Sequence, residues 1–99
     1  MIFFGVILKV NFYATFRVLT GKKTVEFELP VGSSIRDLIN QVIAIFPAFT
    51  GQLLDGQGEM FRHIHVFING RDTYYLPEGL ETVLQQDEKI DIFPPVAGG

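Results

Sequence analysis

The sequence predicts an α+β domain in which one amphipathic helix packs on one face of a β-sheet. One stretch carries apolar residues at helical spacing, and several others alternate apolar and polar residues as strands do. A helix with one apolar stripe has to bury it, and a sheet with one apolar face offers the complementary surface. The length of 99 residues fits a single domain with one hydrophobic core, and the absence of cysteine excludes disulfides and thiolate sites.

Two strands are predicted in the first third of the chain. The first covers residues 6–13 and the second residues 24–29, and both alternate apolar and polar side chains. Residues 20–23 supply turn chemistry, and residues 14–19 make the connection longer than a tight hairpin. We therefore expect two adjacent antiparallel strands. Their core-facing side chains are Val6, Leu8, Val10, Phe12, Val25, Phe27 and Leu29.

A helix follows Ser34. Its apolar residues recur every three or four positions, as one face of a helix requires. They are Ile35, Leu38, Ile39, Val42, Ile43 and Phe46. Ser34 suits the N-cap position, and Asp37 places a carboxylate near the positive end of the helix. Pro47 ends the helix because the residue before a proline is disfavoured in the α conformation.

The second half of the chain begins with a long connection. Residues 48–62 contain three glycines and are predicted to be partly irregular, held to the domain by Leu53 and Leu54. A third strand covers residues 64–68. The Asn69-Gly70 pair that follows is the strongest two-residue hairpin signal in the chain.

Three short elements complete the predicted fold. Residues 73–76 form the strand that pairs across the hairpin turn, residues 80–84 form one helical turn, and residues 89–93 form the last strand. One helix crossing from the second strand to the third is the arrangement of a β-grasp, or ubiquitin-like, roll. We expect a mixed sheet of about four to five strands on one main helix. The domain then covers residues 1–93, and residues 94–99 form an extended tail.

The composition narrows the choice of partners. The formal net charge is −3, and the single basic doublet, Lys22-Lys23, is too small for a nucleic-acid footprint. The apolar run over residues 1–8 is far shorter than the ~20 residues of a membrane helix. It also lacks the basic start and the cleavage site of a signal peptide. We therefore expect a cytoplasmic protein that binds neither nucleic acid nor membrane.

No complete internal active site is predicted. Ser34 is better explained as a helix cap than as a nucleophile, since no His and acid accompany it at a recognisable spacing. His63 and His65 are two apart on a predicted strand and would share a face, but zinc needs at least a third protein ligand. A solvated rim or a charged docking surface is expected from three acidic residues around the last strand, Asp87, Glu88 and Asp91.

The end of the chain has a different chemistry. Pro94-Pro95 fixes two φ angles and favours an extended polyproline II segment directly after the last strand. The side chains that follow become progressively smaller: Val96, Ala97, Gly98 and Gly99. Two glycines pass through a narrow channel and adopt backbone angles barred to other residues. Such an arm is suited to carry a carboxylate into a partner's site, and the alternative is a frayed end that finishes by chance in small residues.

Three stretches resemble known proteins. Residues 93–99, Phe-Pro-Pro-Val-Ala-Gly-Gly, are similar to the terminal signature of the small subunit of molybdopterin synthase. Residues 10–14, Val-Asn-Phe-Tyr-Ala, followed by Arg17 and Gly21, resemble the opening strand and loop of that family. Residues 66–72, Val-Phe-Ile-Asn-Gly-Arg-Asp, resemble a segment of ubiquitin-related modifiers that act as sulfur carriers. The apolar start and the long middle connection depart from shorter family members and leave the pathway open.

The resemblance implies a mechanism centred on the last residue. A ubiquitin-activating-like adenylyltransferase, using ATP and magnesium, would adenylate the carboxylate of Gly99. Sulfur from a persulfide enzyme would displace AMP and leave a thiocarboxylate. In molybdenum or tungsten cofactor synthesis the tail then enters the large subunit of molybdopterin synthase, within a heterotetramer, and donates sulfur to a pterin precursor. This chain would bind no cofactor itself and would be the non-catalytic, sulfur-donating subunit of a sulfurtransferase.

Two further residues are assigned to partner binding. Phe93 is opposite in parity to Ile90 and Ile92, so it is expected to face away from the core at the root of the tail. An aromatic there can anchor a partner, and the alternative is a second-layer core residue. Arg17 matches a family position in the first loop, and the resemblance implies a partner contact.

Three other functions stay open at this point. The first is a sulfur carrier for tRNA or thiamine thiolation, which uses the same activated tip. The second is a modifier whose Gly99 forms an isopeptide bond with lysines of target proteins. The third is an interaction domain whose tail has no role.

Overall fold

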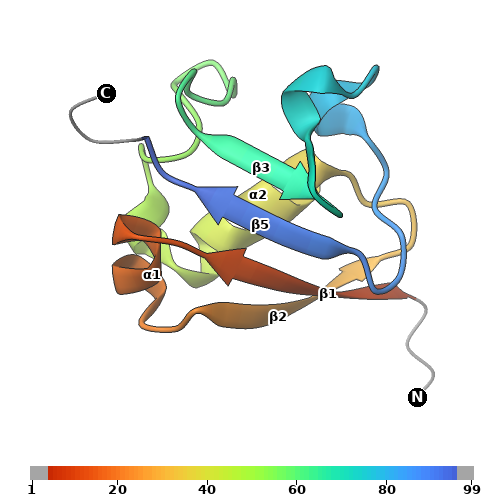
Figure 1. The fold of residues 1–99 in the computed structure, drawn as a ribbon, viewed down its shortest axis with the longest axis horizontal. Coiled ribbons are helices and arrows are strands. Elements are labelled where there is room, and N and C mark those ends of the chain that lie inside the picture. Colours follow the sequence, from red (N-terminus) through yellow and green to blue (C-terminus); the bar gives the residue numbers. More distant parts are fainter. Residues whose placement is uncertain (1–4, 96–99) are drawn as a thin grey trace.

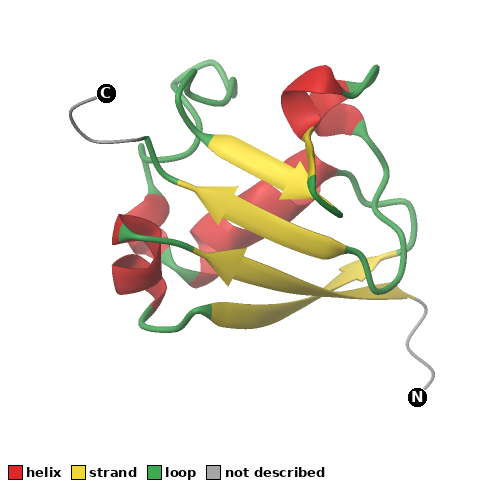
Figure 2. Ribbon diagram, viewed as in Figure 1, coloured by secondary structure: helices red, strands yellow, loops and turns green. Residues whose placement is uncertain are grey.

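The computed structural model describes residues 5–95 and has the predicted α+β, β-grasp architecture (Figure 1). A five-stranded mixed sheet in the order β2-β1-β5-β3-β4 is crossed on one face by the longer helix (Figure 2). The strands are β1 (Gly5–Phe12), β2 (Thr24–Pro30), β3 (His65–Ile68), β4 (Arg71–Asp72) and β5 (Lys89–Phe93). The helices are α1 (Thr15–Thr20) and α2 (Ile35–Ile45), and 3₁₀ turns lie at Pro47–Phe49, Thr73–Tyr75 and Gly79–Glu81.

The first and last strands of the chain are neighbours at the centre of the sheet. β1 pairs in parallel with β5, which places Val10 beside Ile90. On its other side β1 pairs antiparallel with β2, as predicted, with Val10 opposite Val25. β3 runs antiparallel to β5 and completes the mixed sheet.

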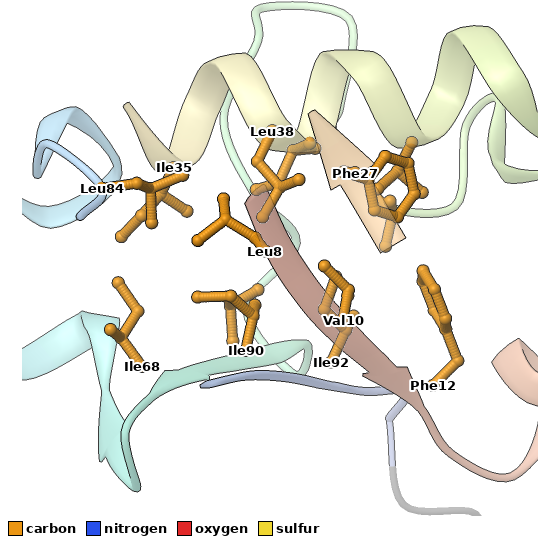
Figure 3. Packing of buried hydrophobic residues seen from close by; sticks show 14 of the residues in the cluster. Leu8, Val10, Phe12, Phe27, Ile35, Leu38, Ile68, Leu84, Ile90 and Ile92 are labelled. Carbon is orange, nitrogen blue, oxygen red and sulfur yellow. The ribbon is translucent and has the colours of Figure 1, made fainter. Parts of the chain in front are cut away.

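The hydrophobic core lies between the sheet and α2 (Figure 3). Leu8, Val10 and Ile90 point from the central strands towards the helix, and Ile35 and Leu38 point from α2 towards the sheet. All five side chains are fully buried, which confirms the predicted inward faces of these elements. Each buried apolar side chain of this size contributes about 1.5–3 kcal/mol to folding.

The start of α2 is closed by a reciprocal capping box. The hydroxyl of Ser34 accepts a hydrogen bond from the backbone N–H of Asp37 at 3.2 Å, and the Asp37 carboxylate accepts one from the backbone N–H of Ser34 at 2.9 Å. These two bonds satisfy N–H groups that a helix leaves without an internal partner. The helix ends at Ile45, with Phe46 as its C-cap before Pro47. Both predicted ends of the helix are confirmed.

Replacing Ser34 by alanine is expected to lower the free energy of unfolding by about 1 kcal/mol, because the cap acceptor is lost. Urea unfolding measures this change. The matched control is Ser34→Asn, which keeps a side-chain oxygen at the cap and should stay within about 0.5 kcal/mol of the parent protein. Equal losses in the two variants would show that the hydroxyl's cap bond does not stabilise α2.

The connection between the first two strands contains a helix that the sequence pattern did not predict. Residues 14–19, predicted as part of an open connection, form most of α1. The chain turns at Ala14, which has a φ of 52°, and Phe16 is buried in the core. Gly21 ends the helix with a left-handed φ of 72°, and its N–H donates to the carbonyl of Arg17 at 2.9 Å. Burial of one aromatic side chain therefore stabilises a helix of only six residues.

The predicted hairpin after β3 is confirmed, but its second strand is shorter and earlier than expected. Asn69 and Gly70 have φ angles of 51° and 83°, so both central residues of the turn have the positive φ of a type I′ hairpin. The strand across the turn is Arg71–Asp72, and the prediction of residues 73–76 is wrong. The carboxylate of Asp72 accepts a hydrogen bond from the N–H of Tyr74 at 2.9 Å, which caps a 3₁₀ turn and ends the strand.

The predicted helical turn at residues 80–84 lies earlier in the chain. It is the 3₁₀ turn at Gly79–Glu81, and it ends because Val83 pairs as an isolated bridge with Ser34. In the preceding connection Leu53 is fully buried and Leu54 partly buried, so both hold residues 48–62 to the domain as predicted. No helix within residues 5–95 is long and apolar enough to cross a membrane.

Candidate functional site

The last strand leads into the candidate site, the tail root, which consists of Phe93, Pro94 and Pro95. Because β5 is parallel to β1 and antiparallel to β3, the tail root lies where β1 ends and β3 begins, with His65 opposite Phe93. α1 lies at the same end of the molecule (Figure 1). Pro94 is buried and Pro95 is exposed. The remaining residues of the predicted tail lie outside the described residues: Val96, Ala97, Gly98 and Gly99.

Phe93 belongs to an aromatic row on the face of the sheet opposite α2. Its ring stacks on that of Tyr13, with centroids 4.2 Å apart and planes 10° apart. Its other side receives the edge of Phe67, with centroids 5.4 Å apart. Phe93 therefore faces away from the main core, as its parity predicts, and is half-buried between two rings. Its role in partner binding stays a prediction.

Asp91, two residues before Phe93, anchors the same aromatic row. Its carboxylate accepts hydrogen bonds from the Tyr13 hydroxyl at 2.8 Å and from the Asn11 side-chain amide at 3.0 Å. The ammonium group of Lys89 lies 3.8 Å away. Asp91 is only 6% exposed, so its expected place in a solvated rim is wrong. The sequence did not predict the burial of this carboxylate, because it does not show that β1 lies beside β5. The hydrogen-bond donors that surround the carboxylate come from β1 and the residue after it.

Tyr13 connects this carboxylate to the tail root. Its hydroxyl binds Asp91 while its ring stacks on Phe93, so one side chain holds two positions of β5. The hydrogen bond to Asp91 and, second, burial raise the pKa of Tyr13, so the phenol remains a protonated donor at neutral pH. The sequence pattern did not predict this pair. Its only signal was that Tyr13, Asp91 and Phe93 each follow the outward parity of their strands.

Replacing Tyr13 by phenylalanine is expected to lower the free energy of unfolding by about 1–3 kcal/mol, because a buried carboxylate loses a hydrogen-bond donor. The ring and its stacking on Phe93 are retained in this variant. Tyr74→Phe is the matched control, since Tyr74 is 82% exposed and its hydroxyl has no hydrogen bond to a described residue. Urea unfolding of both variants at neutral pH provides the comparison.

The same hydrogen bond predicts a dependence on pH. A raised folded-state pKa means that the contribution is present below the unfolded value of about 10 and is lost as the pH rises through the folded value. The parent protein should therefore lose more stability above pH 10 than Tyr13→Phe does. Parallel loss in the two proteins would contradict this role of the Tyr13 hydroxyl.

An apolar groove runs beside the tail root. Its volume is about 610 Å³, and its walls include Tyr13, Phe67, Phe93, Pro94 and Pro95. Aromatic and proline rings that stay partly accessible offer rigid contact area, which partner proteins use as anchoring points. The groove and the tail share residues, so a protein that receives the tail would also contact the groove.

Arg17 lies on α1, at the same end of the molecule as the tail root. It is exposed, and within residues 5–95 its guanidinium forms no ion pair. This placement leaves the side chain accessible to a partner that approaches the tail. A contact between Arg17 and a partner stays a prediction.

The two histidines do not share a strand face. β3 begins at His65, and His63 lies in the preceding turn, where the N–H of Ile64 donates to the carbonyl of Phe61. The Nδ1 atom of His65 pairs with the Asp72 carboxylate at 2.8 Å. Among residues 5–95 no three His, Asp or Glu side chains are grouped as metal ligands would be.

The comparison with protein families matches nearly the whole chain. The matching family model is that of the ThiS family, over residues 10–99. Small archaeal modifier protein 3 of Haloferax volcanii is 33% identical over 93% of this chain and 98% of its own length. A protein of Archaeoglobus fulgidus that is described as a sulfur carrier is 40% identical over 62% of this chain and 73% of its own length.

Solved structures agree with the fold described above. The solution structure of a Haloferax volcanii protein, HVO 2177, has a TM-score of 0.84 and 32% identity and covers 96% of this chain and 88% of its own. A Pyrococcus furiosus protein, described as subunit 1 of the molybdopterin converting factor, has a TM-score of 0.74 and 28% identity. That match covers 92% of this chain and 99% of the Pyrococcus chain.

Proposed function

Because this chain belongs to the ThiS family and is similar to a protein described as a sulfur carrier and to one named as a modifier protein, we propose that it carries sulfur as a thiocarboxylate on Gly99. The observation that carries the proposal is the path of the chain at the end of β5. The tail root is held by β1 and β3 and is followed by four residues that end in Gly98-Gly99. The folded domain therefore fixes the start of a tail whose small residues lead to the reacting carboxylate.

The proposed chemistry has three steps, and other enzymes carry them out. A ubiquitin-activating-like adenylyltransferase joins the Gly99 carboxylate to AMP, using ATP and magnesium and releasing pyrophosphate. The terminal sulfur of an enzyme persulfide then attacks the acyl adenylate, and AMP leaves. A thiol cleaves the resulting sulfur–sulfur bond, which leaves the thiocarboxylate on this chain and a disulfide on the donor side.

The composition of the chain supports a terminal carrier atom. The sequence has no cysteine, so no side-chain thiolate is present to hold the sulfur. The activation of a carboxylate also requires ATP, and this requirement is the basis for placing the protein in the cytoplasm. ATP and magnesium belong to the activating enzyme, and this chain contributes the substrate carboxylate.

For the sulfur acceptor we propose a pterin precursor, with this chain as the small subunit of molybdopterin synthase. The support is the sequence of residues 93–99 and the 28% identity with the Pyrococcus protein described as a molybdopterin converting factor subunit. The large subunit of the synthase would then receive the tail, in a heterotetramer, for molybdenum or tungsten cofactor synthesis. Acceptors in tRNA or thiamine synthesis use the same activated end.

A second function, protein modification, has equal support. The Haloferax relative that is 33% identical over nearly the whole of both chains is named as a modifier protein. In that case the deprotonated ε-amine of a target lysine attacks the adenylated Gly99, AMP leaves, and an isopeptide bond forms with loss of the amine proton. The same activated intermediate serves both functions, and only the nucleophile differs.

Mass spectrometry of the protein from its native host tests these functions. Intact-mass analysis should find a fraction heavier by the difference between sulfur and oxygen, which is the mark of a thiocarboxylate. A digest of the host proteome should show whether target lysines carry Gly-Gly remnants. The sulfur-bearing form without remnants supports carriage alone, and remnants without that form support modification alone. If neither product is found in cells that express the protein, the proposed function is wrong.

A further inference from the structure

Four basic side chains lie towards the end of the molecule from which the tail leaves. Arg17 lies on α1, Lys22 and Lys23 lie in the turn between α1 and β2, and Arg62 lies just before β3. All four residues are exposed. Residues 12–23, 44–54 and 60–64, which contribute to this end, contain no Asp or Glu, and two carboxylates, Asp72 and Asp91, lie beside the tail root. We call the four residues the basic end.

Part of the basic end lies beside the tail root. The carbonyl of Lys23 accepts a hydrogen bond from the N–H of Phe12 at 2.7 Å, which fixes this turn to the end of β1. Arg62 lines a hollow of about 500 Å³ together with Thr15 of α1 and Pro95 of the tail root. Figure 1 shows that α1 and the C-terminal end of β5 lie at the same end of the sheet. Arg62 and α1, which carries Arg17, therefore lie beside the point where the tail leaves, and the turn with Lys22 and Lys23 lies at the same end of the sheet.

These cations are not neutralised by the part of the chain that the structure describes. The ion pairs among residues 5–95 are Arg36–Glu81, His65–Asp72 and Lys89–Asp91, and none includes a member of the basic end. Two carboxylates lie near the tail root on the face of the sheet opposite α2, and both already have partners within the domain. Asp72 pairs with His65, and Asp91 accepts from Tyr13 and Asn11.

The rest of the molecule has the opposite charge. The whole chain has 8 basic and 11 acidic residues, for a formal net charge of −3. Without the basic end, four cations remain against 11 carboxylates, which is a formal charge of −7. Such a separation of charge orients a molecule in the field of a charged partner before contact. Here the orientation places the tail first.

We propose that the basic end docks on an acidic surface beside the opening that receives the tail in the activating enzyme. This inference rests on the proposed function, because it assigns the surface to the enzyme that adenylates Gly99. A protein partner fits better than nucleic acid, since the strongly acidic remainder repels a phosphate backbone on all but one end. Steering by complementary charge raises the association rates of proteins by roughly 10- to 10³-fold. The effect weakens as salt is added, because salt screens the charges.

The matched pair Arg62→Glu and Arg71→Glu tests the docking surface. Both residues are exposed arginines, one before β3 in the sequence and one after it. Neither forms an ion pair within residues 5–95, and both substitutions change the net charge by the same amount. Only Arg62 lies at the basic end. Association rates with the adenylyltransferase of the same organism are measured by stopped flow, at about 50 mM and about 500 mM salt.

The expected result is a fall in association rate of about tenfold for Arg62→Glu at low salt, and less than about twofold for Arg71→Glu. Arg17→Glu should behave as Arg62→Glu does, and all differences should shrink at high salt. Equal effects of Arg62→Glu and Arg71→Glu, or an effect that salt leaves unchanged, would overturn the proposal. So would RNA binding that Arg62→Glu abolishes while the association rate with the enzyme stays unchanged.

A variant without Gly98 and Gly99 separates this inference from the proposed function. It should still associate with the enzyme at a salt-dependent rate, because the basic end is intact, while forming no adenylate. Salt-dependent association with no sulfur-bearing product from the full chain would refute sulfur carriage and leave the docking surface standing. Thermal unfolding of each charge variant confirms that the domain is folded.

Discussion

Deletion of Gly98 and Gly99 is expected to abolish adenylate and thiocarboxylate formation completely while leaving the domain folded. The reason is that the reacting carboxylate would then belong to Ala97, two residues short of the activating site. The free energy of unfolding should change by less than about 0.5 kcal/mol, because the deleted residues follow the core-forming strand β5. Intact-mass analysis after incubation with the activating enzyme, ATP and a persulfide donor measures the product.

The control for this deletion keeps the length and the terminal carboxylate of the tail. Ala97→Gly changes only the residue before the glycine pair, so it should retain most of the product. The deletion variant is also expected to form no conjugates with target lysines. Sulfur-bearing product or conjugates formed by the deletion variant would refute Gly99 as the reacting residue.

The largest effect on stability is expected for Phe49→Ala, a loss of about 3–5 kcal/mol. Phe49 is fully buried, and its ring packs against Phe12 at 5.6 Å and edge-on against Phe16 at 5.2 Å between centroids. Removing it leaves a cavity beneath both β1 and α1. Because small domains have only about 5–15 kcal/mol of stability, a sizeable unfolded fraction is expected near physiological temperature. Denaturant unfolding gives the magnitude.

Phe61→Ala is the control, since Phe61 belongs to the same long connection but is 40% exposed. Its loss should be well below that of Phe49→Ala, because part of the Phe61 side chain is already in water. Similar losses for Phe49→Ala and Phe61→Ala would show that the connection contributes to the core through its backbone path and not through the Phe49 ring.

Elements set by local sequence were predicted well. Ser34 and Asp37 are three residues apart, and their capping box needs only helical geometry to form. The Asn69-Gly70 turn follows from the backbone preferences of two adjacent residues. The same locality explains the errors, since a capped 3₁₀ turn after Asp72 competes with a strand at that position and burial of Phe16 stabilises a helix in a stretch without strong periodicity.

By itself the sequence determined the α+β class, the main helix with both of its ends, the strand faces and the terminal Gly-Gly signature. Each of these depends on side-chain period or on neighbours within a few residues. Only the tertiary structure decided that β1 lies beside β5. That pairing brings Tyr13 to Asp91, 78 positions away, and stacks Tyr13 on Phe93. The tertiary structure also places Arg62 in one hollow with Thr15 of α1 and Pro95 of the tail root. Alternation shows which face a residue occupies but not which strand is its neighbour, so contacts across the sheet depend on a register that no local pattern specifies.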